Sequence, residues 1–499
     1  MSSAIKDTRS WTDGRVIKKE IAKYMDGKKE DFIPDQKIAE KIRDNQKTDP
    51  KKVRDILKKS LAVETLTPDE TAVLLNVSDK SLWEEMKETA GKVKKKVYDN
   101  RIVTFAPLYL GNLCVNNCAY CGFRCENAAA ERKVLSPGEI RSEVMALAGK
   151  IGHKRLIVVY GEHPETDADY IASSIKEIYS VVVKTKKGTG RIRRVNVNAS
   201  PMSINDLKKL QKAGIGTYQV FQETYHHDTY QAVHPAGTIK SDYKWRLYCM
   251  HRAFEAGIDD FGIGALFGLY DWKFEAMGLL YHSIELERRF GVGPHTISFP
   301  RFVPAQNSAL TYNSKFKVRD EDFMKLITVI RLAVPHTGMI LTARETAAIR
   351  GEAMPLGVTQ IDASTRIGIG AYSKEDGGQH DERQQFLLGD TRSLDEVIGE
   401  LAAKGSITSF CTAGYRCGRT GKCIMELLKK GEEGKFCKLN AILTFREWLD
   451  DFAGETTKAS GKKVIEREIE EIRVKMPKAY PRLMEAYEKI KNGERDIYF

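Results

Sequence analysis

The sequence predicts an α/β fold: a (β/α)8 TIM-type barrel with helical N-terminal and C-terminal extensions. Two observations predict the barrel. Short runs rich in β-branched and aromatic residues recur eight times between residues 100 and 365, as buried parallel strands do. Amphipathic stretches with apolar residues three and four positions apart lie between these runs. The flanking regions show mainly the helical spacing.

The N-terminal extension comprises residues 1–85. Helical spacing predicts helices over residues 11–24, 35–44 and 51–62. A further helix is expected after Thr67, because a threonine cap followed by Pro68 in the first position is a typical helix start.

The barrel comprises residues 86–400. Its expected strands are 102–110, 155–160, 195–199, 217–222, 260–267, 296–302, 339–343 and 359–363. Helices are expected between them, including 137–148, 167–185, 204–213 and 321–332. Barrel enzymes carry their catalytic residues at the C-terminal ends of the strands, so we look for site residues there. Residues 401–499 form a cysteine-rich, helical region that we expect to carry an auxiliary metal cluster.

Composition excludes several functional classes. With 42% hydrophobic residues, the 499-residue chain can bury a large core, and no run of 18 apolar residues predicts a membrane span. The formal charge is +12, but the lysines are dispersed among acids, which indicates solvated helix faces rather than a nucleic-acid surface. The N-terminal residues lack the apolar segment of a secretory signal. We therefore expect a cytoplasmic protein without a membrane or nucleic-acid partner.

The nine cysteines are clustered, with four between residues 114 and 125 and four between residues 411 and 437. Only Cys249 stands apart, in a helical pattern typical of a core residue. A secreted disulfide framework would show neither this clustering nor this chain length. Clustered thiolates therefore indicate metal binding in a reducing compartment.

Three cysteines of the first group, Cys114, Cys118 and Cys121, follow the first expected strand. Their spacing lets a tight loop turn three thiolates towards one [4Fe-4S] cluster and leaves one iron open for S-adenosylmethionine (SAM). The alternatives are a zinc site with Cys125 as fourth ligand, or three unrelated buried cysteines. The spacing, the aromatic Tyr120 and the preceding strand favour a radical SAM cluster.

Residues at the ends of later strands are candidates for SAM binding. Glu162 can accept the SAM ammonium, and Gly161 beside it lets the backbone approach the ligand. Gly262 and Gly264 on the fifth strand suit close approach by adenine, although glycines in strands also mark bulges.

The third and fourth strands end at Asn198 and Glu223. Either side chain can bond the ribose hydroxyls of SAM. Each is equally suited to capping the end of its strand.

Several longer segments resemble one family. These segments span residues 113–122, 194–198, 221–226, 262–270, 293–298, 409–413 and 440–445. Across residues 100–450 the chain resembles the HydG family, the tyrosine lyases of [FeFe]-hydrogenase maturation, which are related to the thiamine-pathway tyrosine lyase.

The resemblance implies a reaction. The reduced cluster cleaves SAM, and the resulting 5′-deoxyadenosyl radical takes hydrogen from the amino group of L-tyrosine. The Cα–Cβ bond then breaks to give p-cresol and dehydroglycine, which this family converts to CO and cyanide at a second cluster in the C-terminal region. Implied partners are reduced ferredoxin or flavodoxin as electron donor and other hydrogenase maturation proteins.

The resemblance also implies roles for single residues. Arg344 would hold the tyrosine carboxylate, with Thr342 adding a hydroxyl where the family pattern resembles Ser-x-Arg, and Arg301 is a second candidate for a carboxylate of SAM or substrate. His282 would ligate a labile iron beside the second cluster. The alternatives are a salt bridge at the barrel mouth for Arg344 and a structural role for His282.

The second cysteine group departs from the family pattern, which resembles Cys-x2-Cys-x22-Cys. Cys411 and Cys437 match the outer positions, but Gly414 stands in the middle. Cys417 and Cys423 lie close by, so one of them replaces the missing ligand, all four hold a cluster or zinc, or all four are reduced thiols. Without an open iron there, the enzyme stops at dehydroglycine. A non-catalytic Fe–S carrier is the alternative from another class.

Overall fold

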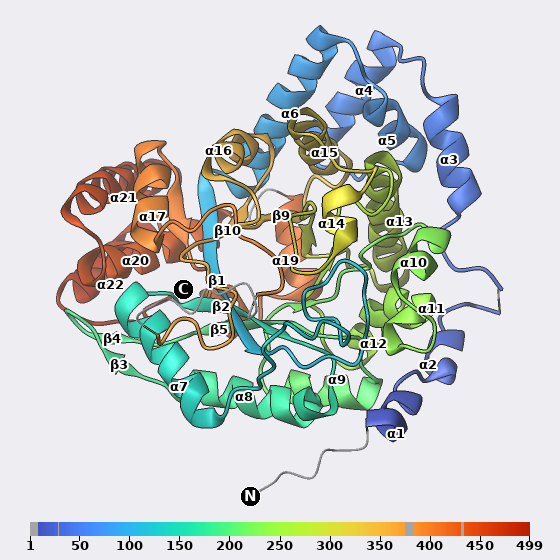
Figure 1. The fold of residues 1–499 in the computed structure, drawn as a ribbon. Coiled ribbons are helices and arrows are strands. Elements are labelled where there is room, and N and C mark those ends of the chain that lie inside the picture. The colour runs from blue at the N-terminus through green and yellow to red at the C-terminus, as the bar shows by residue number, and fades with distance from the viewer. Residues whose placement is uncertain (1–7, 28, 375–383, 431–433) are drawn as a thin grey trace, which may run out of the picture.

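Eight parallel strands close into a barrel at the centre of the molecule (Figure 1). The computed structural model describes residues 8–27, 29–374, 384–430 and 434–499. In order around the barrel the strands are β1 (Arg101–Gly111), β2 (Arg155–Tyr160), β5 (Arg194–Asn198), β6 (Tyr218–Gln219), β7 (Phe261–Gly264), β8 (Thr296–Ser298), β9 (Gly338–Leu341) and β10 (Gln360–Asp362). Pairing of β10 with β1 closes the ring. The predicted (β/α)8 barrel is confirmed, and each expected strand overlaps an observed one.

Strand β1 is the longest, and all eleven of its residues are buried. It pairs in parallel with β2, β10 and a ninth strand, β11 (Ile407–Ser409), which lies beside its first residues, Arg101 to Val103. We had not expected β11. The expected helix over 167–185 ends early, because α8 (Ala168–Ser180) gives way to a small hairpin of β3 (Val183–Lys184) and β4 (Thr189–Gly190).

Helices surround the barrel (Figure 1). In addition to α8 they are α7 (Pro137–Met145), α9 (Ile204–Lys212), α10 (His227–Val233), α11 (Tyr243–Leu247), α12 (Cys249–Glu255), α13 (Trp272–Phe290), α14 (Ala309–Asn313), α15 (Asp320–Ala333) and α16 (Ala347–Leu356). A π-helical turn, Ala146–Ile151, continues α7, and short 3-10 turns span Pro164–Thr166 and Ile239–Ser241. Typical caps begin several of them: Ser136 and Glu139 form a capping box at α7.

Among the described residues, six helices precede the barrel: α1 (Thr8–Asp13), α2 (Lys18–Ala22), α3 (Asp35–Asp44), α4 (Pro50–Leu61), α5 (Pro68–Leu75) and α6 (Lys80–Tyr98). The expected helix over 11–24 is thus two short helices. At α5 the predicted cap forms, since the Thr67 hydroxyl accepts from the Glu70 amide at 3.3 Å. The boundary expected at residue 85 falls inside α6, which packs on α15 and α4 and leads into β1.

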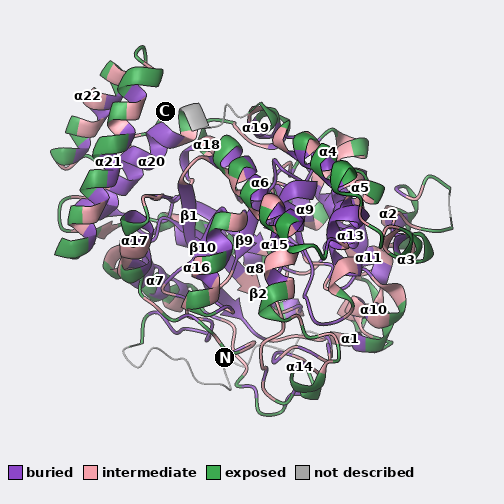
Figure 2. Cartoon of the chain, turned by 90° about the horizontal axis from the view of Figure 1, so that it is seen from above, coloured by how far each residue is buried: buried purple, intermediate pink, exposed green. Residues whose placement is uncertain are grey.

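The C-terminal region contributes α17 (Leu394–Ala403), α18 (Ala413–Arg416), α19 (Gly421–Lys429), α20 (Gly434–Asp451), α21 (Glu455–Lys475) and α22 (Tyr480–Lys491). Figure 2 shows α20 largely buried, while α21 and α22 expose their outer faces. The buried carboxylate of Glu447 on α20 joins this region to the barrel, at 2.8 Å from Arg193 and 3.2 Å from Lys154. Among the described helices, none has both the length and the apolar character needed to cross a membrane.

Candidate active site

A cavity of about 210 Å³ opens at the C-terminal ends of the barrel strands. The loop after β1 brings the thiols of Cys114, Cys118 and Cys121 to its wall. Seven other residues predicted for the site also line it: Tyr120, Gly161, Glu162, Asn198, Glu223, Thr342 and Arg344. The structure therefore brings residues from four strand ends and the cysteine loop to one place.

The cysteine loop is closed by its own backbone. The Cys121 amide donates to the Cys118 carbonyl at 3.1 Å, and the Cys125 amide donates to the Asn116 carbonyl at 2.9 Å. Burial raises the pKa of Cys114 to about 11 and that of Cys118 to about 12. Such thiols ionise only with a cation among them, as in a metal site.

The arrangement of these thiols is not that of ligands around a single ion. In the described part of the chain, no three of the cysteine sulfurs lie within 4.8 Å of one another, as ligands of one zinc ion would. Cys125 is exposed and does not line the cavity. The zinc alternative with Cys125 as fourth ligand therefore finds no support.

A free acceptor faces the cavity beside the cysteine loop. Glu162 is buried, and its Oε2 accepts from the Asn116 Nδ2 at 2.6 Å, while its Oε1 has no hydrogen-bond partner among the described residues. Asn116 Nδ2 also lies 3.8 Å from the Cys114 sulfur. A Cβ on Gly161 would lie 2.1 Å from the Leu113 carbonyl oxygen, so only glycine lets the loop approach β2. An unpaired buried acceptor fits the ammonium group of SAM.

Glu223 is already paired with two cations. Its carboxylate accepts from Lys240 Nζ at 2.8 Å and from Arg246 Nη2 at 3.2 Å. Burial opposes its ionisation, but these two neighbours lower the pKa of Glu223 below the usual value. Lys240 and Arg246 also line the cavity. The sequence gives no signal for them, because Lys240 lies in the α10–α11 connection and Arg246 on α11, rather than at a strand end.

Arg344 supplies a half-buried cation in the cavity wall. Its guanidinium stacks 3.3 Å from the centroid of the Phe386 ring. In the described part of the chain, no carboxylate lies within 4 Å of it, so the alternative of a barrel-mouth salt bridge finds no support. The Thr342 hydroxyl nearby is buried without a hydrogen-bond partner among the described residues. Both groups are therefore available to a polar ligand.

Asp362, at the C-terminal end of β10, lines the same cavity and was not predicted. Its Oδ2 accepts from the Thr365 hydroxyl at 2.9 Å. Its Oδ1 has no hydrogen-bond partner among the described residues, and Arg350 Nη2 approaches it to 3.8 Å. Burial raises the pKa of Asp362. Its position at a strand end was the signal that could have revealed it.

Three predicted residues of the barrel do not line this cavity. The guanidinium of Arg301 is held by the Glu345 carboxylate at 2.9 Å and by Asp320 at 2.8 Å, so the structure does not support a carboxylate-binding role for it. A Cβ on Gly262 would lie 2.9 Å from the Gln219 side chain, and one on Gly264 would lie 2.7 Å from the Phe221 ring. These glycines make room for neighbours that line the cavity.

His282 lies apart from both groups of cysteines. It is buried on α13, with Nδ1 3.0 Å from the Tyr225 hydroxyl and its ring 5.3 Å from that of Phe32. Burial lowers the pKa of His282 to about 3. These contacts support the structural alternative and not the iron-ligand role that the resemblance implied.

A second, smaller cavity lies at the opposite end of the barrel, where β1 and β10 begin. Cys411 and Cys437 line it, together with Gly414 and His295. Cys417 and Cys423 are exposed, and neither is part of its wall. The structure thus brings together two of the four C-terminal thiols.

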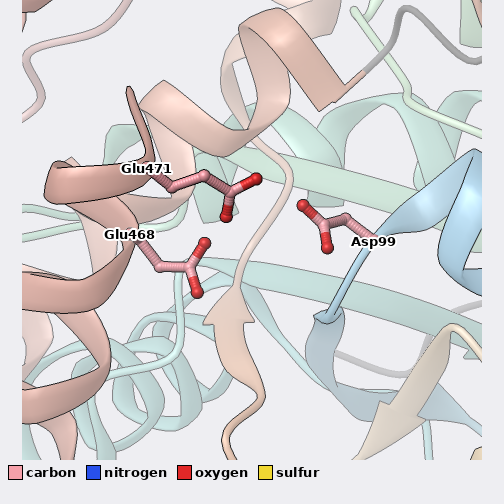
Figure 3. A group of neighbouring side chains, drawn as sticks. All are labelled: Asp99, Glu468 and Glu471. Atoms are coloured by element: carbon pink, nitrogen blue, oxygen red, sulfur yellow. The ribbon is translucent and has the colours of Figure 1, made fainter. Parts of the chain in front are cut away.

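One acidic group resembles a metal site but is an ion-pair network. Asp99, Glu468 and Glu471 point towards one another (Figure 3). The ammonium group of Lys438 lies 2.6 to 2.7 Å from all three carboxylates. Protein cations therefore pair with these carboxylates, since Arg467 also contacts Glu468 and Lys475 also contacts Glu471.

The barrel and its three-thiol loop define the class of radical SAM enzymes. Comparison with known proteins agrees, since the Radical SAM superfamily pattern matches residues 108–280 and that of the Biotin and Thiamin Synthesis associated domain matches residues 298–407. Membership of this class implies a [4Fe-4S] cluster and SAM as cofactors.

Solved structures define the family more closely. The crystal structure of HydG, a maturase of the [FeFe]-hydrogenase, superposes with a TM-score of 0.88 at 46% identity over 94% of this chain and 100% of that one. The structure of HydG from Carboxydothermus hydrogenoformans superposes with a TM-score of 0.75 at 35% identity, over 95% of this chain and 99% of that one. The 2-iminoacetate synthase of Escherichia coli (strain K12) is 28% identical over 352 residues, 70% of this chain and 88% of the synthase. The chain belongs to the HydG family of radical SAM enzymes.

Proposed function

We propose that this protein is a radical SAM lyase that cleaves the Cα–Cβ bond of L-tyrosine to p-cresol and dehydroglycine. The observation that carries the proposal is Arg344, a half-buried cation in the cavity wall without a carboxylate partner in the described chain. Such a group suits the carboxylate of an amino-acid substrate. The similarity to HydG and to a 2-iminoacetate synthase supports the same reaction.

The cofactors have suitable residues. Cys114, Cys118 and Cys121 would hold the cluster, and Glu162 Oε1 would accept a hydrogen bond from the SAM ammonium. When bound, the reduced cluster and SAM supply a 5′-deoxyadenosyl radical that removes one hydrogen atom from the substrate. The barrel wall excludes water from that radical.

The amino-acid end of tyrosine would lie near the cysteine loop. Arg344 lines the same cavity as Tyr109, Glu223 and Cys121, which supports a position of its guanidinium on the cluster side. A carboxylate bound there, with the Thr342 hydroxyl beside it, holds the substrate amino group towards the site of the radical. Orientation of this kind is a large part of the catalytic effect of an enzyme.

The aromatic ring has a matching region of wall. Phe105, Ile157 and Ile340 form a separate buried apolar cluster in the barrel interior, and Asp362 pairs with Phe105 in register. Asp362 Oδ1, which has no hydrogen-bond partner among the described residues, would accept a hydrogen bond from the phenolic hydroxyl. Recognition of a hydroxyl by a buried acceptor distinguishes tyrosine from phenylalanine.

The reaction balances with an external reductant. Loss of one hydrogen atom from tyrosine and scission of the Cα–Cβ bond leave dehydroglycine and a hydroxybenzyl radical. One electron and one proton then give p-cresol. Reduced ferredoxin or flavodoxin would supply this electron and the one that cleaves SAM.

Two further outcomes compete downstream of this step. Conversion of dehydroglycine to CO and cyanide for hydrogenase maturation requires a second cluster, whereas Gly414 favours a lyase that stops at dehydroglycine. The non-catalytic Fe–S carrier is disfavoured, because a carrier has no use for the unpaired Glu162 acceptor and the Arg344 cation in one cavity.

The test is anaerobic turnover of the reconstituted protein with dithionite, SAM and either tyrosine or phenylalanine. We expect p-cresol from tyrosine and no toluene from phenylalanine. Asp362→Asn should narrow the preference for binding tyrosine over phenylalanine, and Thr365→Val, which removes the partner of the other Asp362 oxygen, serves as the control. Deoxyadenosine without p-cresol from the unaltered protein would contradict the proposal.

A further inference from the structure

We infer that the C-terminal cavity of this chain holds no three-thiolate cluster, so that the protein is a single-cluster enzyme. The pattern that the family resemblance implies needs three thiolates, and the cavity offers two, from Cys411 and Cys437. Gly414 occupies the wall position between them. The residues present therefore do not fit the implied group.

The glycine at this position is not required by the backbone. Gly414 lies in α18, outside the left-handed region, and a Cβ built on it would meet only the Arg419 carbonyl oxygen at 3.6 Å and the Arg419 Cβ at 3.9 Å. These are ordinary contacts. By contrast, Gly421 in the same segment has φ +50°. A cysteine would fit at position 414, so this chain lacks a thiol there without lacking the space for one.

The two extra cysteines do not take its place. The Cys417 thiol lies 3.5 Å from the Phe499 carbonyl oxygen, at the C-terminal end of the chain. On α19, Ile424 and Leu428 line the cavity one helical turn apart, and Cys423 is exposed. Reaching the cavity would require α19 to rotate its apolar face out of the core.

A single ion is also not favoured. His295 lines the cavity, with Nδ1 2.8 Å from the Asp260 carboxylate and 3.2 Å from the Tyr415 hydroxyl. Within the described chain, however, its ring nitrogens and the sulfurs of Cys411 and Cys437 do not all lie within 4.8 Å of one another. One zinc or iron ion could not bond all three without a rearrangement.

A consequence follows that rests on the proposed function: dehydroglycine leaves the enzyme without conversion to CO and cyanide. The inference about the cluster itself does not rest on it. Iron content can therefore be measured whether or not the protein cleaves tyrosine.

The experiment uses the full chain, reconstituted anaerobically with ferrous iron and sulfide. We expect about four iron and four sulfide ions per chain in the unaltered protein, the content of one [4Fe-4S] cluster. Gly414→Cys should raise both to about eight and add an EPR signal that SAM does not perturb. Gly138→Cys is the matched control, because Gly138 lies on α7 with no atom within 4 Å of its added Cβ, and it should leave the count unchanged.

Three results would overturn the inference. One is about eight iron ions in the unaltered protein, in which case Cys417→Ser and Cys423→Ser would show which thiol is the ligand. Another is loss of iron on Cys411→Ser, which should have no effect on the count. The third is a folded Gly414→Cys protein, with an unchanged melting temperature, that gains no iron.

Discussion

The two cysteine regions of this molecule lie at opposite ends of one barrel and differ in what surrounds their thiols. At the C-terminal ends of the strands, all three expected cysteines line one cavity, with the free Glu162 acceptor and the Arg344 cation facing the same space. At the other end, two of four cysteines line a cavity and the other two face solvent. Cysteine content alone therefore does not define a cluster site, because the loop must also aim each thiol.

The largest expected effect is that of Cys118→Ala. We expect deoxyadenosine formation to fall below detection, because a cluster with two thiolates from this loop would not bind SAM productively. Product is measured by chromatography after anaerobic turnover, with Cys125→Ala as the control that keeps activity. Substantial deoxyadenosine from Cys118→Ala would mean that the first cysteine region does not hold the SAM-binding cluster, so the two regions would no longer differ in this respect.

The next largest expected effect is that of Arg344→Gln on the KM for tyrosine. Loss of this charge-assisted contact in the cavity should raise the KM for tyrosine on the order of 100-fold and spare uncoupled SAM cleavage. Arg301→Lys is the control, because Arg301 is engaged with Glu345 outside the cavity, and its KM should change little. An unchanged KM in Arg344→Gln would exclude Arg344 from substrate binding.

Glu162→Gln should have a smaller effect, confined to SAM. Replacement of the carboxylate weakens a hydrogen bond to a cation, which corresponds to roughly 10-fold to 100-fold weaker SAM binding. Equilibrium binding of SAM to the reconstituted protein measures it, and the KM for tyrosine at saturating SAM should stay constant. A shift in the tyrosine KM with unchanged SAM affinity would mean that Glu162 binds tyrosine and not SAM.

The smallest expected effect tests the C-terminal region. The double change Cys417→Ser and Cys423→Ser should alter the free energy of unfolding by less than about 0.5 kcal/mol, as exposed side chains usually do. Denaturation of the reconstituted protein measures it. A loss of several kcal/mol would mean that these thiols bind metal and that the two regions are alike.

Much of the fold was predictable from the sequence. Buried parallel strands are continuous apolar runs, so the eight strands of the barrel could be recognised without any tertiary information. The unpredicted β11, β3 and β4 have only two or three residues each, too few to show a period. Their pairing depends on β1 and on the turn between β3 and β4. The strands β6, β8 and β10 are equally short, but they lie within the longer runs 217–222, 296–302 and 359–363.

The site was predictable in part. Local spacing indicated Cys114, Cys118 and Cys121, whose placement the loop itself determines. Arg301 and His282 do not line the cavities expected for them, because their neighbours come from distant segments: Glu345 holds one, and Tyr225 and Phe32 surround the other. Sequence spacing cannot show such contacts.

The comparison between the two regions is tested most directly by one anaerobic turnover mixture. The reconstituted protein, dithionite, SAM and tyrosine would be combined, and p-cresol, deoxyadenosine, CO and cyanide measured together. We predict p-cresol with deoxyadenosine, and neither CO nor cyanide, because only the cavity beside Cys114 carries chemistry. CO and cyanide formed in step with p-cresol would contradict this account and show that the region around Gly414 holds a working cluster.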